Sequence, residues 1–332
     1  MPFQFDREAE RARTLATIAR LPESKRQALI DEYQRRSEAA FAPETLRNFR
    51  SIIRLFSTWC VENGYEPEPP IEPQIVAAYV ESVGGRLRPK TIETRLWAIA
   101  ELHRSRFLPS PCRHRIVELA LMGVKRKYGA ASRQAPPLCR LDVMKVVRGL
   151  GANSAELRDK ALILTASDSW CRASELVAFR VRDLERQDDG SSVLYIARSK
   201  TDQFGEGNYA FLSQHGTEAV LAWIEHRGLE SGDPIFTKSQ RNAARKPLDT
   251  ATVSRIFKRR FSRSDVSAHS TRVGGVHDAF RLGCNLASIM VAGRWTSPEM
   301  PARYGRRILA GQSAAAQVAR IIDNDPPEDP NQ

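Results

Sequence analysis

Apolar residues in the first 130 positions of the chain recur at the 3.6-residue period of an α-helix, in one segment after another. In residues 43–63 they fall at i, i+3, i+7, i+10 and i+14, so they share one face of a helix. Pro43 and Glu44 open this segment, and both residue types favour a helix N-terminus. The sequence therefore predicts an all-helical domain over residues 1–128. Its helices are expected at 24–37, 43–63, 71–83, 89–107 and 112–128.

The composition changes after this domain. Residues 125–137 read KRKYGAASRQAPP, a run of small, basic and proline residues without apolar periodicity, which is typical of an interdomain linker. We place the linker at 129–137. A length of 332 residues fits two domains at about 100–200 residues each. The second domain is then expected over 138–322, followed by an acidic, proline-rich and disordered tail at 323–332.

The second domain combines helical patterns with a short β-type region. Two β-type runs, 191–200 and 208–213, flank a segment that contains Gly205 and Gly207, which predicts a hairpin or small sheet. Helices are expected at about 140–151, 155–170, 215–227, 250–261, 272–282, 285–293 and 313–322. The predicted fold class is mainly α with a small β-sheet, in which an all-helical N-terminal domain precedes a mixed α+β domain.

The charge of the chain points to a polyanionic partner. Lys and Arg number 51 against 39 Asp and Glu, which gives a net charge of +12 and a pI near 9.8. Nucleic acid is the leading candidate, and a positive excess that only keeps the protein in solution is the alternative.

No apolar run approaches the roughly 18–20 residues of a bilayer span, and the first residues lack the apolar core of a secretory signal. We therefore expect an intracellular protein without membrane contact. Five scattered cysteines lack metal-ligand spacing and are interpreted as reduced small hydrophobes.

Three short patterns in the second domain contain the residue types that cleavage of a phosphodiester requires. They are Arg172-Ala173-Ser174-Glu175-Leu176, His269-Ser270-Thr271-Arg272, and Trp295 followed nine positions later by Tyr304. Each pattern alone is weak, because such ion pairs are usually on the surface and aromatic residues are usually in the core. Cleavage without a metal needs a nucleophile, cations that offset the charge developing on the phosphate, and an acid for the leaving oxygen. The three patterns together supply these groups.

The order of these residues is that of a known enzyme family. R-x-x-E-L, a lysine on the following hairpin, H-x-x-R, Trp and Tyr occur in the order found in tyrosine recombinases. The chain resembles the phage integrase family, and most closely its Cre-type site-specific recombinases. The segments that carry the resemblance are SWCRASELVAFRVRDL (169–184), ARSKT (197–201), SAHSTRVGGVHDAFRLG (267–283) and IMVAGRWTSPEMPARYGRR (289–307). The resemblance covers nearly the whole chain and implies two domains that close around duplex DNA as a clamp.

The resemblance also implies a role for each site residue. The implied catalytic residues are Arg172, Glu175, Lys200, His269, Arg272, Trp295 and Tyr304. The tyrosine would attack a phosphodiester, which yields a 3′-phosphotyrosine and a free 5′ hydroxyl. Both arginines can offer a planar fork of donors to the phosphate, and the histidine and tryptophan can donate further hydrogen bonds. The glutamate would orient an arginine or the histidine, and the lysine would act as general acid. Because the covalent link stores the energy of the broken bond, no ATP or other energy cofactor is expected. No metal is expected either, because these side chains supply the groups that metal-free cleavage needs.

One position departs from the family pattern, and a second has two possible explanations. Arg294 precedes Trp295 where the family often has glycine, so either the turn that presents Trp295 differs or an extra cation lies near the phosphate. Gly305 directly follows Tyr304 and suits a tyrosine that moves between two positions, although an ordinary helix end explains this glycine equally well.

Two basic clusters are predicted to contact DNA phosphates, with a solvated charged face as the alternative for the first of them. They are Arg47, Arg50 and Arg54, and Lys258, Arg259 and Arg260. The apolar helix at 313–322 would dock into a neighbouring protomer, as the resemblance implies, or else pack within its own chain. We expect a homotetramer on two specific sites of double-stranded DNA, which exchanges strands through a Holliday junction. The need for accessory proteins is left open.

The predicted function is site-specific DNA recombination in a bacterial or phage-encoded system, such as DNA integration by a mobile genetic element. The expected location is the cytoplasm, at the nucleoid. Two alternatives remain. The first is a catalytically silent, sequence-specific DNA-binding protein of the same fold, and the second uses the same chemistry to relax supercoils or to resolve hairpin telomeres.

Overall fold

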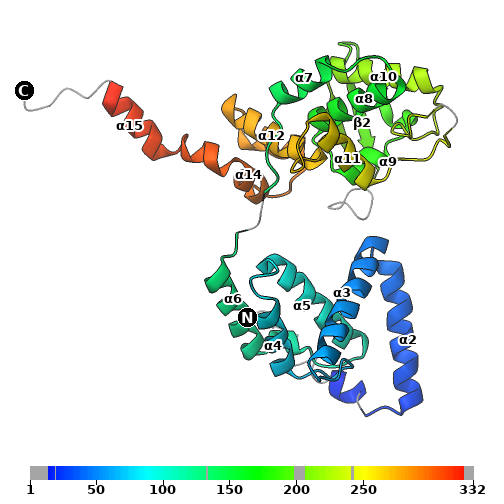
Figure 1. Cartoon of the computed structure of the whole chain (residues 1–332), viewed down its shortest axis with the longest axis vertical. Helices are drawn as coiled ribbons and strands as arrows, with labels where there is room; N and C mark the ends of the chain where they lie inside the picture. Colours follow the sequence, from blue (N-terminus) through cyan, green and yellow to red (C-terminus); the bar gives the residue numbers. More distant parts are fainter. Residues whose placement is uncertain (1–13, 19, 132–133, 198–205, 241–242, 325–332) are drawn as a thin grey trace, which may run out of the picture. The chain divides into compact units, whose positions relative to one another are not determined.

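The structure is a computed structural model that describes residues 14–18, 20–131, 134–197, 206–240 and 243–324. The chain divides into two compact units, Met1–Arg133 and Gln134–Gln332 (Figure 1). The division falls within the segment 129–137 that the sequence predicts as a linker. Each unit has its own hydrophobic core, and the two are described separately below.

The described part of the first unit is helical. Its elements are α2 (Glu23–Ala40), α3 (Pro43–Glu62), α4 (Pro73–Val83), α5 (Pro89–Ser105), the 3-10 turn η1 (Pro111–Arg113) and α6 (Arg115–Tyr128). A proline opens α3, α4 and α5, where its missing N–H costs no intrahelical hydrogen bond. The stripe on α3 packs as the sequence predicts, because Phe56 and Cys60 are fully buried and the Phe56 ring meets Tyr79 edge-on at 4.9 Å.

The second unit combines helices with one small sheet. The helices are α7 (Arg140–Arg148), α8 (Ser154–Ser169), α9 (Ala173–Ala178), α10 (Gln214–Arg227), α11 (Thr250–Arg260), α12 (Ala268–Arg281), α13 (Leu286–Gly293), α14 (Glu299–Ala310) and α15 (Ala314–Asn324), with a 3-10 turn η2 (Val181–Asp183). The strands β1 (Leu184–Arg186), β2 (Ser192–Ile196) and β3 (Asn208–Leu212) form an antiparallel sheet in the order β1-β2-β3. In its register, Leu194 pairs with Leu184 on one side and with Ala210 on the other. The predicted fold class, mainly α with a small sheet, is confirmed.

Helix α8 lies at the centre of the second unit. It packs against α7, α10, α12 and β3, so nearly every side of it is covered (Figure 1). This explains why its sequence is apolar on several faces rather than along one stripe. The helix begins at the cap Asn153, whose side chain accepts from the backbone N–H groups of Ala155 and Glu156, and it ends at Trp170. Trp170 is left-handed, with φ 50°, and so turns the chain sharply toward α9.

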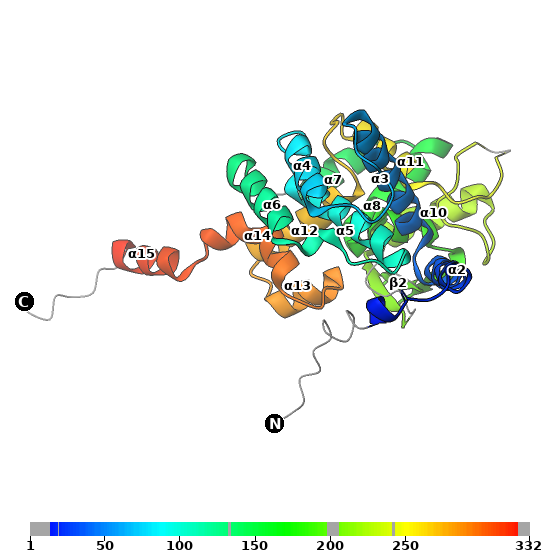
Figure 2. The same cartoon turned by 90° about the horizontal axis from the view of Figure 1, so that it is seen from below.

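Helices α12, α13 and α14 lie side by side and enclose a small apolar cluster (Figure 2). Val276, Phe280, Ile289 and Tyr304 are its principal buried members. Gly305 lies inside α14, where a Cβ atom would overlap the ring of Phe280. The glycine therefore permits close contact between α14 and α12, and the interpretation of this position as a helix end is wrong.

The structure differs from the sequence-based expectation in several elements. Helix α12 begins at Ala268 rather than at 272, because Ser267 caps it. Helices α9 and α14 and strand β1 lie outside every predicted range. The expected strand 191–200 is a strand only over Ser192–Ile196, and residues 198–205 lie outside the described residues. Helix α15 extends to Asn324, two residues into the predicted tail, whose remainder is also outside the described part.

Candidate active site

Six of the seven predicted catalytic residues come together in the second unit. Arg172 and Glu175 lie at the start of α9, and His269 and Arg272 lie in the first two turns of α12. Trp295 follows α13, and Tyr304 lies on α14. The seventh, Lys200, is outside the described residues. The early start of α12 matters here, because it places the histidine and the arginine on one helix, three positions apart.

The hydroxyl of Tyr304 is hydrogen-bonded to the side chain of His269. The hydroxyl oxygen lies 3.1 Å from Nε2 of the histidine, and the two rings meet edge-on with centroids 5.7 Å apart. The ring of Trp295 also meets the tyrosine ring edge-on, at 5.9 Å. The backbone carbonyl of Tyr304 accepts from Nε2 of His277 at 2.9 Å and from the Gln134 side chain at 3.2 Å. The tyrosine is therefore held at its backbone, its ring and its hydroxyl.

Burial and two cations set the protonation states of this pair. Burial lowers the pKa of His269 below its ordinary value, and the positive charges of Arg272 and Arg172 lower it further. The imidazole is therefore neutral at pH 7, and with Nε2 unprotonated it accepts a hydrogen bond from the tyrosine hydroxyl. Burial also raises the pKa of Tyr304, while Arg272, Arg172 and Arg303 act in the opposite direction. A phenolate at this position would be stabilised by the cations around it.

Arg272 is the most deeply buried cation of the site, with 1% of its surface exposed. One guanidinium nitrogen, Nη1, donates to the carbonyl of Trp170 at 2.6 Å, and Nη2 donates to the carbonyl of Gly293. The guanidinium also lies over the Trp295 ring, 4.4 Å from its centroid, in a cation–π contact. Burial and the neighbouring arginines lower its pKa to about 10, so it remains charged at pH 7.

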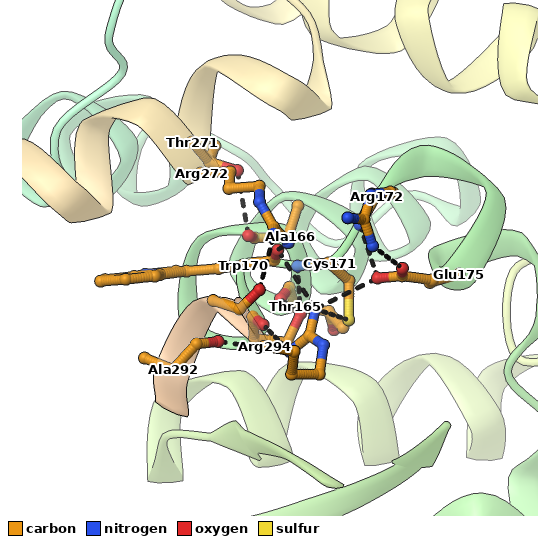
Figure 3. A network of polar contacts seen from close by, with 12 residues as sticks. Thr165, Ala166, Trp170, Cys171, Arg172, Glu175, Thr271, Arg272, Ala292 and Arg294 are labelled. Atoms are coloured by element: carbon orange, nitrogen blue, oxygen red, sulfur yellow. Dashed lines mark hydrogen bonds and ion pairs between the residues drawn. The ribbon is translucent and has the colours of Figure 1, made fainter. Parts of the chain in front are cut away.

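Arg172 and Glu175 form a pair that also caps α9 (Figure 3). The carboxylate accepts from the backbone N–H of Arg172 at 2.9 Å and from its Nη1 at 2.7 Å. Burial alone would raise the pKa of Glu175, but these hydrogen bonds and the charge of Arg294 outweigh it, so the pKa lies below the ordinary value. The R-x-x-E spacing thus serves helix capping and arginine orientation at the same time.

Arg294 settles the question that its departure from the family pattern raised. Its backbone is left-handed, with φ 54°, which is the conformation that glycine adopts most easily. The turn that presents Trp295 therefore has the backbone conformation that a glycine would give it. The side chain of Arg294 is buried and donates from Nη2 to Glu175 at 3.1 Å (Figure 3), so the extra cation lies behind the carboxylate. The partner of Arg294 lies 119 positions away in the chain, so no local sequence pattern indicates it.

Glycines allow the two tryptophans of the site to approach the helices. A Cβ atom at Gly275 on α12 would overlap the indole of Trp170, and one at Gly293 would overlap the ring of Trp295. The indoles of Trp170 and Trp295 in turn lie 6.3 Å apart between centroids. The two glycines are visible in the sequence, but their role in making room for the tryptophans is evident only from the packing.

The predicted DNA-contact residues have different surroundings. In the first unit, Arg47 and Arg50 are exposed and pair with Glu44 and Glu38, and Arg54 is exposed as well. In the second unit, Lys258 is exposed on α11.

The other two members of this cluster, by contrast, bind the fully buried Asp159 on α8. Arg259 does so at 2.9 Å and Arg260 at 2.7 Å. These two arginines therefore hold α11 against α8, and Arg260 is mostly buried.

Comparison with known proteins identifies the chain. The sequence profile described as the phage integrase family matches residues 141–307, a stretch that contains every predicted catalytic residue. The chain belongs to the phage integrase family. It is 29% identical to the Cre recombinase of Escherichia phage P1 over 326 residues, which cover 90% of this chain and 93% of that protein. It is also 26% identical to an integrase/recombinase XerD homologue of Selenomonas ruminantium, over 86% of this chain and 87% of that protein.

Solved structures show the same fold. The integrase of the transposon Tn1549, in complex with transposon right end DNA, aligns with a TM-score of 0.62 at 12% identity, over 83% of this chain and 94% of that one. A λ integrase dimer bound to a COC′ core site aligns with a TM-score of 0.55 at 18% identity, over 84% and 94%. The predicted recognition, fold class, function and enzyme class are confirmed: this family member is a tyrosine recombinase, an enzyme of site-specific DNA recombination. The catalytically silent alternative is not favoured.

Membrane-spanning helices and metal-binding clusters are both absent from the described residues. None of the helices that the structure describes is long and apolar enough to cross a membrane. Within the same part of the chain, histidine, cysteine and carboxylate side chains do not gather in groups of three or more that could hold a metal ion.

Proposed function

We propose that Tyr304 is the nucleophile of this recombinase and that His269 receives its proton. The observation that carries the proposal is the 3.1 Å contact between the tyrosine hydroxyl and Nε2 of the histidine, beside two arginines. A neutral histidine is a base, and the cations favour the phenolate that forms as the proton leaves. All of these groups belong to one chain, so the nucleophile acts in the site of its own protomer.

In the proposed cleavage step the phenolic oxygen of Tyr304 attacks the phosphorus atom of a DNA phosphodiester. The bond from phosphorus to the 5′ oxygen breaks, and the enzyme keeps the 3′ phosphate as a phosphotyrosine. Lys200 remains the predicted donor of a proton to the leaving 5′ oxygen. In the second step a 5′ hydroxyl of the partner strand attacks the phosphotyrosine and returns its proton to Lys200, while the tyrosine leaves and takes back the proton from His269. The number of phosphoester bonds is conserved, so ATP is not needed, and the arginines would offset the charge on the phosphate that a metal ion offsets in other enzymes.

The two arginines would stabilise the charge on the phosphate in different ways. Arg172 uses Nη1 for Glu175, and its side chain is 23% exposed, so its remaining nitrogens can face a phosphate. Arg272 has both Nη atoms on carbonyl groups and lies under the Trp295 ring. Each Nη group still has a second N–H, so Arg272 can donate to a phosphate in the site while it keeps both carbonyl contacts. Trp295 would then offer its indole N–H to the same phosphate.

The proposed partner is double-stranded DNA with specific recombination sites. The Tn1549 and λ integrases in the comparison are bound to DNA, and the +12 charge of this chain suits such a partner. The candidate phosphate contacts are the exposed side chains of Arg47, Arg50, Arg54, Lys258 and Arg259. Arg260, the sixth predicted contact, is mostly buried and would help by holding α11 in place. Residues 1–128 and 138–322 would act as the two halves of a clamp joined by the linker 129–137. The expected location is the cytoplasm of a bacterial cell, at the nucleoid.

Helix α15 is the proposed contact between protomers. Val318, Ile321 and Ile322 lie exposed on it, which is unusual for large apolar residues that share one helix face. Docking of this helix into a neighbouring protomer would cover them and would build a homotetramer on two DNA sites. Strands would then be exchanged in pairs through a Holliday junction.

The proposed function is tested with a plasmid that carries two copies of the recognition site. The site can be recovered by selecting duplexes from a random library with Tyr304→Phe, which keeps the binding surfaces. The supercoiled plasmid is incubated with the protein in EDTA and without nucleotide. We expect deletion or inversion of the DNA between the sites. Relaxation of the plasmid with no recombinant product would refute recombination in favour of a relaxing activity.

A further inference from the structure

Arg294 adopts its place in the site against two local costs. Its backbone is left-handed, with φ 54° and ψ 48°, a conformation that glycine tolerates far better than a residue with a Cβ atom. Its Nε atom is buried and has no hydrogen-bond partner among the described residues. A glycine at this position would avoid both costs. Local costs of this kind persist where the surrounding structure imposes them, and they concentrate at functional sites.

The guanidinium of Arg294 connects the end of α13 to the segment between α8 and α9 (Figure 3). Nη1 donates to the carbonyl of Ser169 at 2.9 Å, and Nη2 donates to Glu175 Oε2 at 3.1 Å. Nη2 also lies 3.3 Å from the carbonyl of Trp170 and 3.5 Å from Sγ of Cys171. The side chain is 5% exposed. It therefore faces the protein interior rather than the space in front of Arg172.

We propose that Arg294 is a positioning residue that holds the carboxylate of Glu175 from the interior side and thereby leaves one edge of Arg172 free for the phosphate. This inference rests on the proposed function of Arg172. The carboxylate divides its two oxygens: Oε1 binds Nη1 of Arg172, whereas Oε2 binds the backbone N–H of Arg172 and Nη2 of Arg294. Without Arg294, Oε2 would lose its one side-chain cation. The carboxylate could then draw a second guanidinium nitrogen of Arg172 toward itself.

The same residue links the two phosphate-binding arginines. The carbonyl of Trp170 accepts from Nη1 of Arg272 at 2.6 Å and from Nη2 of Arg294 at 3.3 Å. Arg294 therefore fixes the carbonyl that holds Arg272 and the carboxylate that holds Arg172. A purely stabilising role does not account for the choice of arginine, because a buried ion pair contributes little net stability once its desolvation is counted.

Removal of Arg294 also changes the charge around Glu175. The groups that face the carboxylate are Arg172 from α9, Arg272 from α12, Arg294 after α13, and the thiol of Cys171. Burial raises the pKa of that thiol to about 11, so it is neutral at pH 7. Loss of Arg294 leaves two cations for a carboxylate that stays buried, and the pKa of Glu175 should rise as a result.

The test compares Arg294→Gly, which also relieves the backbone, with Arg294→Lys, which keeps a charge but not the planar fork. Ser262→Gly is the matched control, because Ser262 is exposed and left-handed, with φ 50°, and makes no contact with the site. Three quantities are measured on the full chain: the pKa of Glu175 by ¹³C NMR of the labelled carboxyl, assigned with Glu175→Gln; the single-turnover rate of adduct formation; and the Kd for the selected duplex.

We expect Arg294→Gly to raise the pKa of Glu175 and to slow adduct formation by about 10–100-fold, as loss of an orienting partner does in other sites, with an unchanged Kd. Arg294→Lys should restore part of the rate, and Ser262→Gly should match the wild type. A folded Arg294→Gly protein with the wild-type rate would overturn the inference. So would a loss of rate that only follows the unfolded fraction. If Arg294→Gly does not fold, Arg294→Lys decides, and a wild-type rate for it refutes the need for the fork. A wild-type protein that forms no adduct would refute the proposed function instead, and the NMR titration would still decide whether Arg294 holds Glu175.

Discussion

Among the residues that the structure describes, Glu175 supplies the negative charge within the cluster of arginines, and Glu175→Gln removes it while leaving the shape of the side chain unchanged. The carboxylate accepts three hydrogen bonds, at 2.9 and 2.7 Å from Arg172 and at 3.1 Å from Arg294, and 1% of its side chain is exposed. In glutamine one oxygen becomes an NH₂ group, which donates and cannot accept. At least one of the three bonds is lost, and two guanidinium groups lose their counter-charge.

The size of the effect follows from burial. Breaking a buried ion pair by removing one partner costs about 3–5 kcal/mol. Arg172 is partly exposed, so water compensates some of its loss, and glutamine keeps one acceptor. We therefore expect the lower end, about 3 kcal/mol, which lowers Tm by about 6–12 °C in a unit of this size. The pKa of Glu175 is held below its ordinary value, so this stabilisation is full above the unfolded-state pKa of about 4.3 and is lost as pH falls through the folded-state pKa.

Scanning calorimetry of the full chain measures this effect at pH 7 and at steps down to about pH 4 and below. Phe56→Ala serves as the matched control, because it opens the core of the first unit and so identifies the transition that does not belong to the site. The expected result is a lower Tm for Glu175→Gln at pH 7 and a difference that narrows at acid pH. An equal difference at every pH, or none at pH 7, would refute the account of Glu175 as a charged clamp.

Three further predictions concern the tyrosine, the histidine and the last helix. Gly305→Ala pushes a Cβ atom into the ring of Phe280, so it should lower the free energy of unfolding by about 1–3 kcal/mol and slow adduct formation. Gly311→Ala, whose Cβ atom has room, should leave the stability and the rate unchanged. Equal effects of the two substitutions would contradict the packing argument. Because burial and nearby cations lower the pKa of His269, the rate of adduct formation should be flat at and above pH 7 and fall only below the ordinary imidazole pKa of about 6.5. A fall that begins above pH 7 would show that the histidine is not neutral there. A chain that ends at Gly311 should bind a single site normally but lose cooperative assembly on two sites in a gel-shift titration, and retained cooperativity would refute docking of α15 between protomers.

Much of the helical framework could be predicted because its signals are local. The stripe on α3, the prolines that open three helices and the asparagine cap of α8 each lie within a few residues of the feature they specify. Helix α14 was missed because Pro301 and Gly305 look like helix breakers. Pro301 stands at the third position of the helix, where its missing N–H costs nothing, and Gly305 is required by the ring of Phe280. Only the packing against α12 reveals this.

The candidate site shows the same division between local and distant information. The residue types and their order pointed to Arg172, His269, Arg272, Trp295 and Tyr304, because the chemistry of a phosphodiester restricts which side chains can serve.

Ion pairs between residues that lie far apart in the chain could not be predicted from the sequence. Asp159 binds Arg259 and Arg260 from 100 and 101 positions away, and Glu175 binds Arg294 from 119 positions away. An arginine in a basic run, predicted to contact a phosphate, can therefore also form an ion pair that holds two helices together.

The central claim is that Tyr304 forms the covalent link to DNA. The most direct measurement incubates the protein with the selected duplex in EDTA, denatures the mixture, and maps the surviving adduct by mass spectrometry. The account predicts a nucleotide attached to the peptide that contains Tyr304, and no adduct with Tyr304→Phe. An adduct on another residue, or one that survives Tyr304→Phe, would contradict it.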